Sequence, residues 1–177
     1  MRYFFLMIAV VIPGCGGKEE MVTAEAKETI DAAIRKAANK PTGELTKVDL
    51  EKVIYLRLIN HQLTDVPMEV EKLTKLMSLS LQNNQLTDIK GLEKLTQLTR
   101  LHLNANKLTD VPKGLGKLTQ LTSLGLGGNK LTDVKGLEEL TQLEVLHLRD
   151  NHDLTKAQIA ELKKALPKCK IYSNPTK

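Results

Sequence analysis

The sequence has no tryptophan, and aromatic residues make up only 3% of the chain. Beyond residue 14 the only tyrosines are Tyr55 and Tyr172, and there is no phenylalanine. Proteins that bind single-stranded nucleic acids depend on aromatic side chains on which the bases stack. The formal net charge is +5, but lysines and acids are interspersed and form no basic patch. We therefore expect no nucleic-acid partner.

Cysteine is equally scarce, with only Cys15 and Cys169 in 177 residues. The four histidines show no zinc-type spacing with these cysteines, and the sequence contains neither a phosphate-binding loop nor a Gly-x-Ser-x-Gly motif. We therefore expect no metal site, no cofactor and no enzymatic activity. Cys169 alternates with Ile171, which predicts a small buried side chain.

Only one long hydrophobic run is present, from Phe4 to Ile12, and Arg2 precedes it. The run is too short for a membrane-spanning helix, which needs about 20 residues. Gly14 and Cys15 follow it, and this segment resembles a bacterial lipoprotein signal, in which a small residue precedes a cysteine that becomes lipidated.

The resemblance implies a signal peptide over residues 1–14 and lipidation of Cys15, and the polar residues 15–22 are predicted to form a tether. The protein is then exported and anchored to a membrane through Cys15. The alternatives are cleavage without lipidation, which gives a secreted or periplasmic protein, and an uncleaved anchor.

A leucine pattern, L-x-x-L-x-L-x-x-N-x-L, repeats through the middle of the chain every 22 or 23 residues. Its asparagines are Asn84, Asn106, Asn129 and Asn151, the last followed by one extra residue before its leucine. A degenerate first copy begins at Val53 and has His61 in the asparagine position. The pattern is that of a leucine-rich repeat, which stacks into a solenoid.

The predicted fold is α/β: a right-handed leucine-rich-repeat solenoid, shaped as a horseshoe arc, with a parallel sheet on its concave side. Five repeats cover residues 53–154, a helical N-terminal cap covers 23–52, and a helical C-terminal cap with a short terminal strand covers 155–177. The N-terminal helix is expected from Thr23 to Asn39. Capping boxes are expected at Thr46 and Thr155.

The asparagine column is predicted to be structural. An amide carries two donor hydrogens and an acceptor oxygen, so it can satisfy buried backbone groups where the chain leaves each strand. His61 is interpreted as an imperfect member of this ladder at the edge of the solenoid.

Strand alternation directs the leucines inward and the residues between them outward onto the concave side. We call this outward side of the sheet the strand face. Its predicted members are Tyr55, Arg57, Ile59, Ser78, Ser80, Gln82, Arg100, His102, Asn104, Ser123, Gly125, Gly127, Val145, His147 and Arg149. Three of the four arginines beyond residue 14 fall here, with no lysine and no acid.

Arginine presents a planar fork that suits carboxylate or phosphate, so the strand face is expected to bind an anionic peptide, protein or envelope polymer. The predicted ligand-binding residues are Tyr55, Arg57, Gln82, Arg100, His102, Asn104, His147 and Arg149. Gly125, Gly127 and Gly128 are expected to leave either a shallow pocket, flanked by the two histidines, or a weakly packed strand. The histidines are expected to add positive charge below about pH 6.5.

Residues 53–154 resemble bacterial leucine-rich-repeat proteins of the internalin-like kind, especially in Leu-Thr-Asp-Ile-Lys-Gly-Leu-Glu-Lys-Leu-Thr-Gln-Leu. Relatives of this shape serve as adhesins, inhibitors, receptors and scaffolds, so the resemblance implies the fold more than the function. We expect a protein-binding module. The alternative is a structural or scaffold protein of the cell envelope that has no ligand on the strand face.

Overall fold

The computed structural model describes residues 24–175, with side chains from residue 27. The predicted signal peptide over 1–14, the lipidation site Cys15 and the tether over 15–22 lie outside the described residues.

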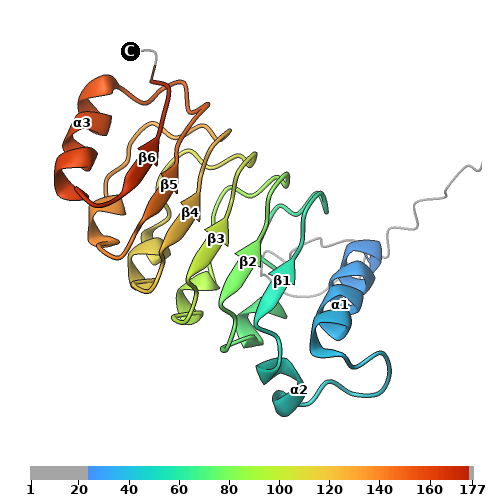
Figure 1. The fold of residues 1–177 in the computed structure, drawn as a ribbon. Helices are drawn as coiled ribbons and strands as arrows, with labels where there is room; N and C mark the ends of the chain where they lie inside the picture. Colours follow the sequence, from blue (N-terminus) through green and yellow to red (C-terminus); the bar gives the residue numbers. More distant parts are fainter. Residues whose placement is uncertain (1–23, 176–177) are drawn as a thin grey trace, which may run out of the picture.

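One parallel sheet organises the described chain (Figure 1). Its strands are β1 (Tyr55–Arg57), β2 (Ser78–Ser80), β3 (Arg100–His102), β4 (Ser123–Gly125), β5 (Val145–His147) and β6 (Lys170–Tyr172), paired in chain order. The sheet is open, with β1 and β6 at its edges. The predicted parallel sheet is confirmed, and so is the terminal strand, which adds a sixth member.

The repeat length sets the register. Leu56, Leu79, Leu101, Leu124 and Leu146 are direct partners across the strands, and Ile171 continues this row in β6. The five leucines of the row are at most 3% exposed. Burial of each leucine side chain contributes about 1.5–3 kcal/mol, so the stacked rows provide most of the stabilisation of the solenoid.

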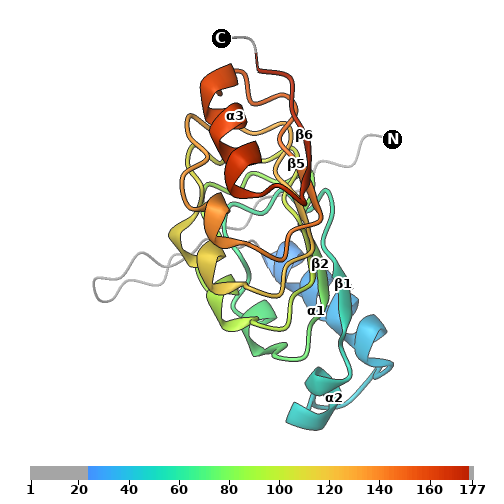
Figure 2. The ribbon, with the colours of Figure 1, turned by 60° about the vertical axis from the view of Figure 1, so that its left-hand side comes forward.

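The other side of the core is formed by short 3-10 helices: η1 (Val70–Lys72), η2 (Leu92–Lys94), η3 (Lys113–Lys117) and η4 (Leu137–Glu139). Figure 2 shows them across the core from the strands. We call this the convex side.

The segments that lead from the end of a strand to the next 3-10 helix, which we call the arcs, are of two kinds. Gly91 and Gly136 enter η2 and η4 with φ of 96° and 94°, whereas Pro112 enters η3 with φ of −61°. The alternation of 22- and 23-residue repeats reflects these two entries.

Helices lie at both ends of the sheet. α1 (Ala24–Ala38) packs beside β1 through Ile30 and Ile34, and α2 (Lys47–Glu51) leads into β1. α3 (Lys156–Ala165) packs against η4 and buries Ile159 and Leu162. Both predicted capping boxes are present.

Ala165 at the end of α3 is exposed, whereas Leu166 turns back into the core. One expectation for this end segment needs correction. Cys169 was predicted to be buried, but it is only half-buried; this partial burial raises the pKa of its thiol.

Asp49 is the one buried carboxylate of the described chain. It accepts hydrogen bonds from the hydroxyl of Thr46 at 2.7 Å and from Nζ of Lys52 at 3.0 Å. The bond from the Thr46 side chain is the largest cause of a strongly lowered pKa, followed by that from Lys52.

The lowered pKa predicts acid sensitivity. The carboxylate of Asp49 binds a proton near pH 4 in the unfolded chain and only at lower pH in the folded chain. The ionised carboxylate therefore stabilises the fold above about pH 4, and this stabilisation is lost as the pH falls towards the lower folded pKa. The urea midpoint should therefore fall more steeply below pH 4 in the wild type than in Asp49→Asn. Equal slopes in the two proteins would contradict this role for Asp49.

Candidate functional site

The strand face consists of three rows that run across the strands. The first row is Tyr55, Ser78, Arg100, Ser123, Val145 and Lys170, and the second is Arg57, Ser80, His102, Gly125, His147 and Tyr172. The third follows the strand ends, where backbone hydrogen bonds continue the ladder, and it includes Gln82, Asn104, Gly127 and Arg149. β6 thus adds Lys170 and Tyr172 to the predicted set.

The charges on the strand face are all positive. Arg57, Arg100, Arg149 and Lys170 are exposed, and none of them forms an ion pair with any residue of the described chain. No aspartate or glutamate occurs in the three rows. The three arginines do not all converge on one point, because Arg57 and Arg149 lie four strand spacings apart, about 19 Å. The face is a positively charged strip, not a single anion pocket.

At the C-terminal end of the strip, the rings of His147 and Tyr172 stack with centroids 4.7 Å apart and planes 6° from parallel. Cζ of Arg149 lies 5.6 Å from the centre of the Tyr172 ring, and Nζ of Lys170 lies 5.2 Å from it. Cations at such distances are attracted to the face of an aromatic ring. We call these four residues the Tyr172 cluster. It was not predicted from the sequence, although the same alternation that directs His147 outward in β5 applies to β6.

The space above Gly125 is filled, so the expected shallow pocket is absent there. A Cβ atom on Gly125 would lie 2.4 Å from Nδ2 of Asn104, whose amide covers the glycine. Oδ1 of Asn104 accepts a hydrogen bond of 2.9 Å from the backbone N–H of Gly127. Asn104 therefore links β3 to the chain that follows β4, and the glycine provides room for its amide.

His102 and His147 flank Gly125 in the second row, as expected from the repeat register. His102 is half-buried, and this burial is the main cause of a lowered pKa; the charges of His147 and Arg100 lower it further. His102 therefore becomes positively charged only at lower pH than the expected value of about 6.5.

This shift makes stability depend on pH in the mildly acidic range. Below about pH 6.5 the unfolded chain binds a proton at position 102 more readily than the folded chain, so the free energy of unfolding falls as the pH is lowered. The urea midpoint should drop less between pH 7.5 and 5.5 in His102→Gln than in the wild type. A wild-type slope in His102→Gln would refute the effect.

The asparagine column forms a connected series of buried hydrogen bonds. Oδ1 of Asn106 accepts from the N–H of Leu86 at 3.0 Å, and its Nδ2 donates to the carbonyls of Leu81 and Leu103, both at 3.0 Å. Asn84, Asn129 and Asn151 make the same three kinds of contact in their own repeats. Each amide therefore bridges its own strand end to the preceding repeat.

The residue before each ladder position adopts a left-handed conformation. Asn60, Asn83, Ala105, Gly128 and Asp150 have φ between 54° and 65°. Alanine is the least suited of these to the conformation, because its Cβ crowds the following carbonyl without a side-chain hydrogen bond to offset it. Ala105→Gly should therefore raise the free energy of unfolding by about 0.5–1 kcal/mol, as measured by urea titration. A loss of stability would contradict the strain at this position.

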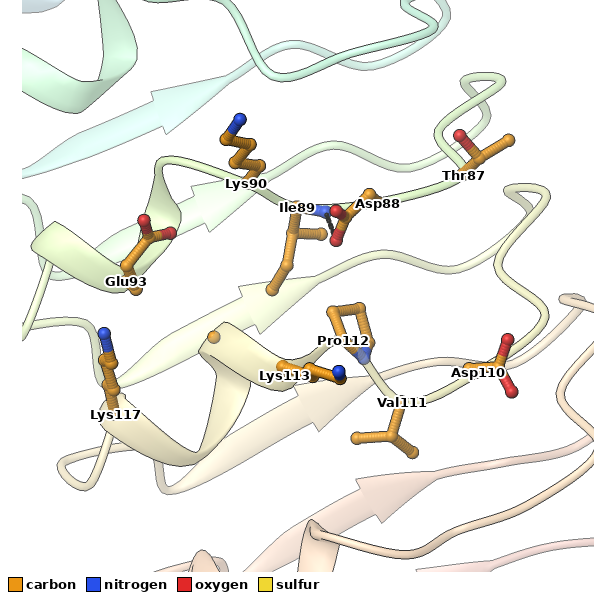
Figure 3. Close-up of a pocket in the computed structure, with 11 residues that line it drawn as sticks. Thr87, Asp88, Ile89, Lys90, Glu93, Asp110, Val111, Pro112, Lys113 and Lys117 are labelled. Carbon is orange, nitrogen blue, oxygen red and sulfur yellow. Dashed lines mark hydrogen bonds between the residues drawn. The ribbon is translucent and has the colours of Figure 1, made fainter.

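The convex side carries a second candidate surface, a groove of about 560 Å³ between the arcs that precede η2 and η3. Figure 3 shows Lys90, Lys113 and Lys117 around it, with Val111 and Pro112 along the lower arc. Asp88, Glu93 and Asp110 also line it, so the charges are mixed. The pKa of Glu93 is lowered, first by a hydrogen bond from its own backbone N–H and then by one from the N–H of Gly91. Glu93 thus stabilises the turn into η2.

The described chain offers neither a metal cluster nor a membrane span. Within residues 24–175, no three His, Cys, Asp or Glu side chains lie close enough together to hold a metal ion. In the same range no helix has both the length and the apolar character needed to cross a bilayer.

Comparison with known proteins places the fold. Residues 47–171 match a family model described as a leucine-rich repeat region. A solved internalin from Listeria monocytogenes is similar over 90% of this chain and 47% of its own, with 26% identity and a TM-score of 0.72. A leucine-rich-repeat protein from Leptospira interrogans is similar over 72% of this chain and 33% of its own, with 37% identity and a TM-score of 0.63.

The chain therefore spans less than half the length of either solved relative. A comparison with curated protein sequences finds no match. Leucine-rich repeats are a domain type generally used for interactions between proteins. The match over residues 47–171, together with the parallel sheet and its buried leucine rows, shows that this chain belongs to the leucine-rich-repeat family.

Proposed function

We propose that this chain is a protein-binding module, not an enzyme, whose strand face binds an acidic segment of a partner protein or peptide. The observation that supports this most is the charge of the strand face: three arginines and one lysine lie there without ion pairs, and no acid accompanies them. Cations on a sheet surface without partners attract carboxylates and disfavour basic partners.

The size of the strand face limits the affinity. Six strands about 4.8 Å apart, each contributing about five residues of 3.3 Å, give roughly 500 Å², compared with about 800 Å² per partner in a standard interface. We therefore expect weak binding that becomes stronger when several anchored copies engage one partner.

The test is selection from a library of random twelve-residue peptides against the full chain at low salt. The selected peptides should be enriched in aspartate and glutamate. The triple variant Arg57→Gln, Arg100→Gln, Arg149→Gln should bind them about 100-fold more weakly, because each lost charge-assisted contact costs about 1 kcal/mol at an exposed site.

The matched control is the triple variant Lys90→Gln, Lys113→Gln, Lys135→Gln, which removes the same charge from the convex side. It should bind the selected peptides as the wild type does. Loss of binding in the lysine variant and not in the arginine variant would reject the strand face. It would favour the alternative, a scaffold that contacts neighbours of the cell envelope through its convex side, where Lys90 and Lys113 line the groove of Figure 3.

Export and lipid anchoring at Cys15 are part of the proposal and rest on the sequence of residues 1–15 alone. We also propose that the solenoid is right-handed and that α1 and α3 act as caps at its two ends. The burial of Ile30 and Ile34 in α1 and of Ile159 and Leu162 in α3 supports a capping role, since an open solenoid end must be covered.

A further inference from the structure

The hydroxyl of Ser80 is the one buried side-chain polar atom without a hydrogen-bond partner among the described residues. Ser80 is the last residue of β2 and only 7% exposed. Its neighbour Leu79 is directed into the core, so strand alternation directs Ser80 towards the strand face. A buried hydroxyl without a partner costs free energy, which a ligand oxygen at this point would recover.

The residues around Ser80 suit an anion. In the register of the sheet, Arg57 lies on one side of Ser80 and His102 on the other, and Arg100 is on β3, one row away. Arg57 and Arg100 are exposed and unpaired, so their guanidinium groups are available to a carboxylate. The Ser80 hydroxyl is buried, so a ligand must displace neighbouring side chains to reach it.

An apolar patch adjoins this group at the N-terminal ends of β1 and β2. Ile54, Tyr55 and Met77 are 40%, 55% and 40% exposed. Ile54 and Met77 are neighbours, because the carbonyl of Ile54 accepts a hydrogen bond of 2.9 Å from the N–H of Met77. Tyr55 is in the first row of the strand face, two residues from Arg57, which is about 7 Å along a strand.

We infer that Ser80, Arg57 and Arg100 form a carboxylate-binding anchor and that the patch of Ile54, Tyr55 and Met77 binds an apolar side chain next to it. The inference rests on the proposed function and specifies its ligand: an extended peptide with an acidic and an apolar residue two positions apart. Residues at that spacing lie on one side of an extended chain, about 7 Å apart. The carboxylate accepts hydrogen bonds from the Ser80 hydroxyl and both guanidinium groups.

The test uses heptapeptides of serine and glycine that carry one leucine and one glutamate and have acetylated and amidated ends. Each peptide is titrated into the full chain, and binding is followed by NMR. Peptides with Leu-Gly-Glu or Glu-Gly-Leu should bind more tightly than peptides with adjacent Leu-Glu. Replacing glutamate by glutamine should weaken binding about tenfold.

Two pairs of variants locate the contacts. Ser80→Ala should weaken binding of the better peptide about tenfold while the melting temperature stays the same or rises, because the unpartnered hydroxyl is removed. Ser123→Ala, a half-buried serine of the first row, is its control and should bind normally. Met77→Ser should remove the advantage conferred by leucine, whereas Met68→Ser, which is exposed in the segment just before η1, should not.

The outcomes separate the anchor from the proposed function. If acidic peptides bind and the triple arginine variant loses them, but Ser80→Ala and Met77→Ser bind as the wild type does, the anchor is wrong and strand-face binding stands. If no acidic peptide binds even at millimolar concentration, both are wrong. A fall in the melting temperature of Ser80→Ala would show that the hydroxyl has a structural partner, which also overturns the anchor.

Discussion

Replacing Asn106 with alanine is expected to lower the free energy of unfolding by about 3–5 kcal/mol. The substitution removes the acceptor for the N–H of Leu86 and the donor to the carbonyls of Leu81 and Leu103. These three backbone groups are buried, and each costs about 1–3 kcal/mol when left without a partner, less where water can enter. Urea titration followed by circular dichroism measures the loss.

Position 61 provides the matched control, because the ladder has no earlier repeat to bridge there. The side chain of His61 is half-buried, and only its backbone N–H takes part, by donating to Oδ1 of Asn84 at 3.0 Å. His61→Ala should therefore change the free energy of unfolding by no more than about 0.5–1 kcal/mol. Similar losses in His61→Ala and Asn106→Ala would contradict the account of the ladder.

Replacing Leu162 with aspartate should open the C-terminal end of the solenoid. The leucine is 3% exposed and packs α3 onto the last repeats, so a carboxylate there is buried without a partner and costs about 4 kcal/mol or more. In a solenoid each repeat is stabilised mainly by its neighbours, so the loss of local stability should be largest next to α3 and should decrease with distance from it.

Hydrogen exchange measures this gradient. Amides of β6 and β5 should lose most protection in Leu162→Asp, and those of β1 and β2 should lose least. The exposed neighbour Lys163, replaced by alanine, should leave the protection pattern unchanged. Uniform loss across β1 to β6 would show that the described chain unfolds as a single unit and that α3 is no local cap.

The repeat could be predicted in detail because one physical rule governs every copy. Alternation along a strand directs Leu79 and Leu101 inward and Arg100 outward, and the constant repeat length brings these leucines into register. The two capping boxes were also predictable, since both partners of each box lie within four residues of one another.

The candidate site could be predicted only in part, because its details depend on contacts between repeats. No local pattern indicates that the amide of Asn104 lies over Gly125, or that Ser80 is buried while Ser78 is not. Both depend on neighbouring repeats: Asn104 comes 21 residues before Gly125, and Arg57 and His102 flank Ser80 in the register of the sheet. The stack of Tyr172 on His147 could have been predicted from the sequence, because extending the outward rows by one strand places these rings side by side.

The most direct test of strand-face binding is a map of amide chemical-shift changes when an acidic peptide from the random library is titrated into the full chain. We predict that the shifts cluster on the strands and the residues just after them, from β1 to β6, and that they shrink as salt is raised, because charge attraction is screened. Shifts confined to the arcs around Lys90, Lys113 and Lys117, with the strands unchanged, would show that the ligand binds the convex side and that the strand face is not the site.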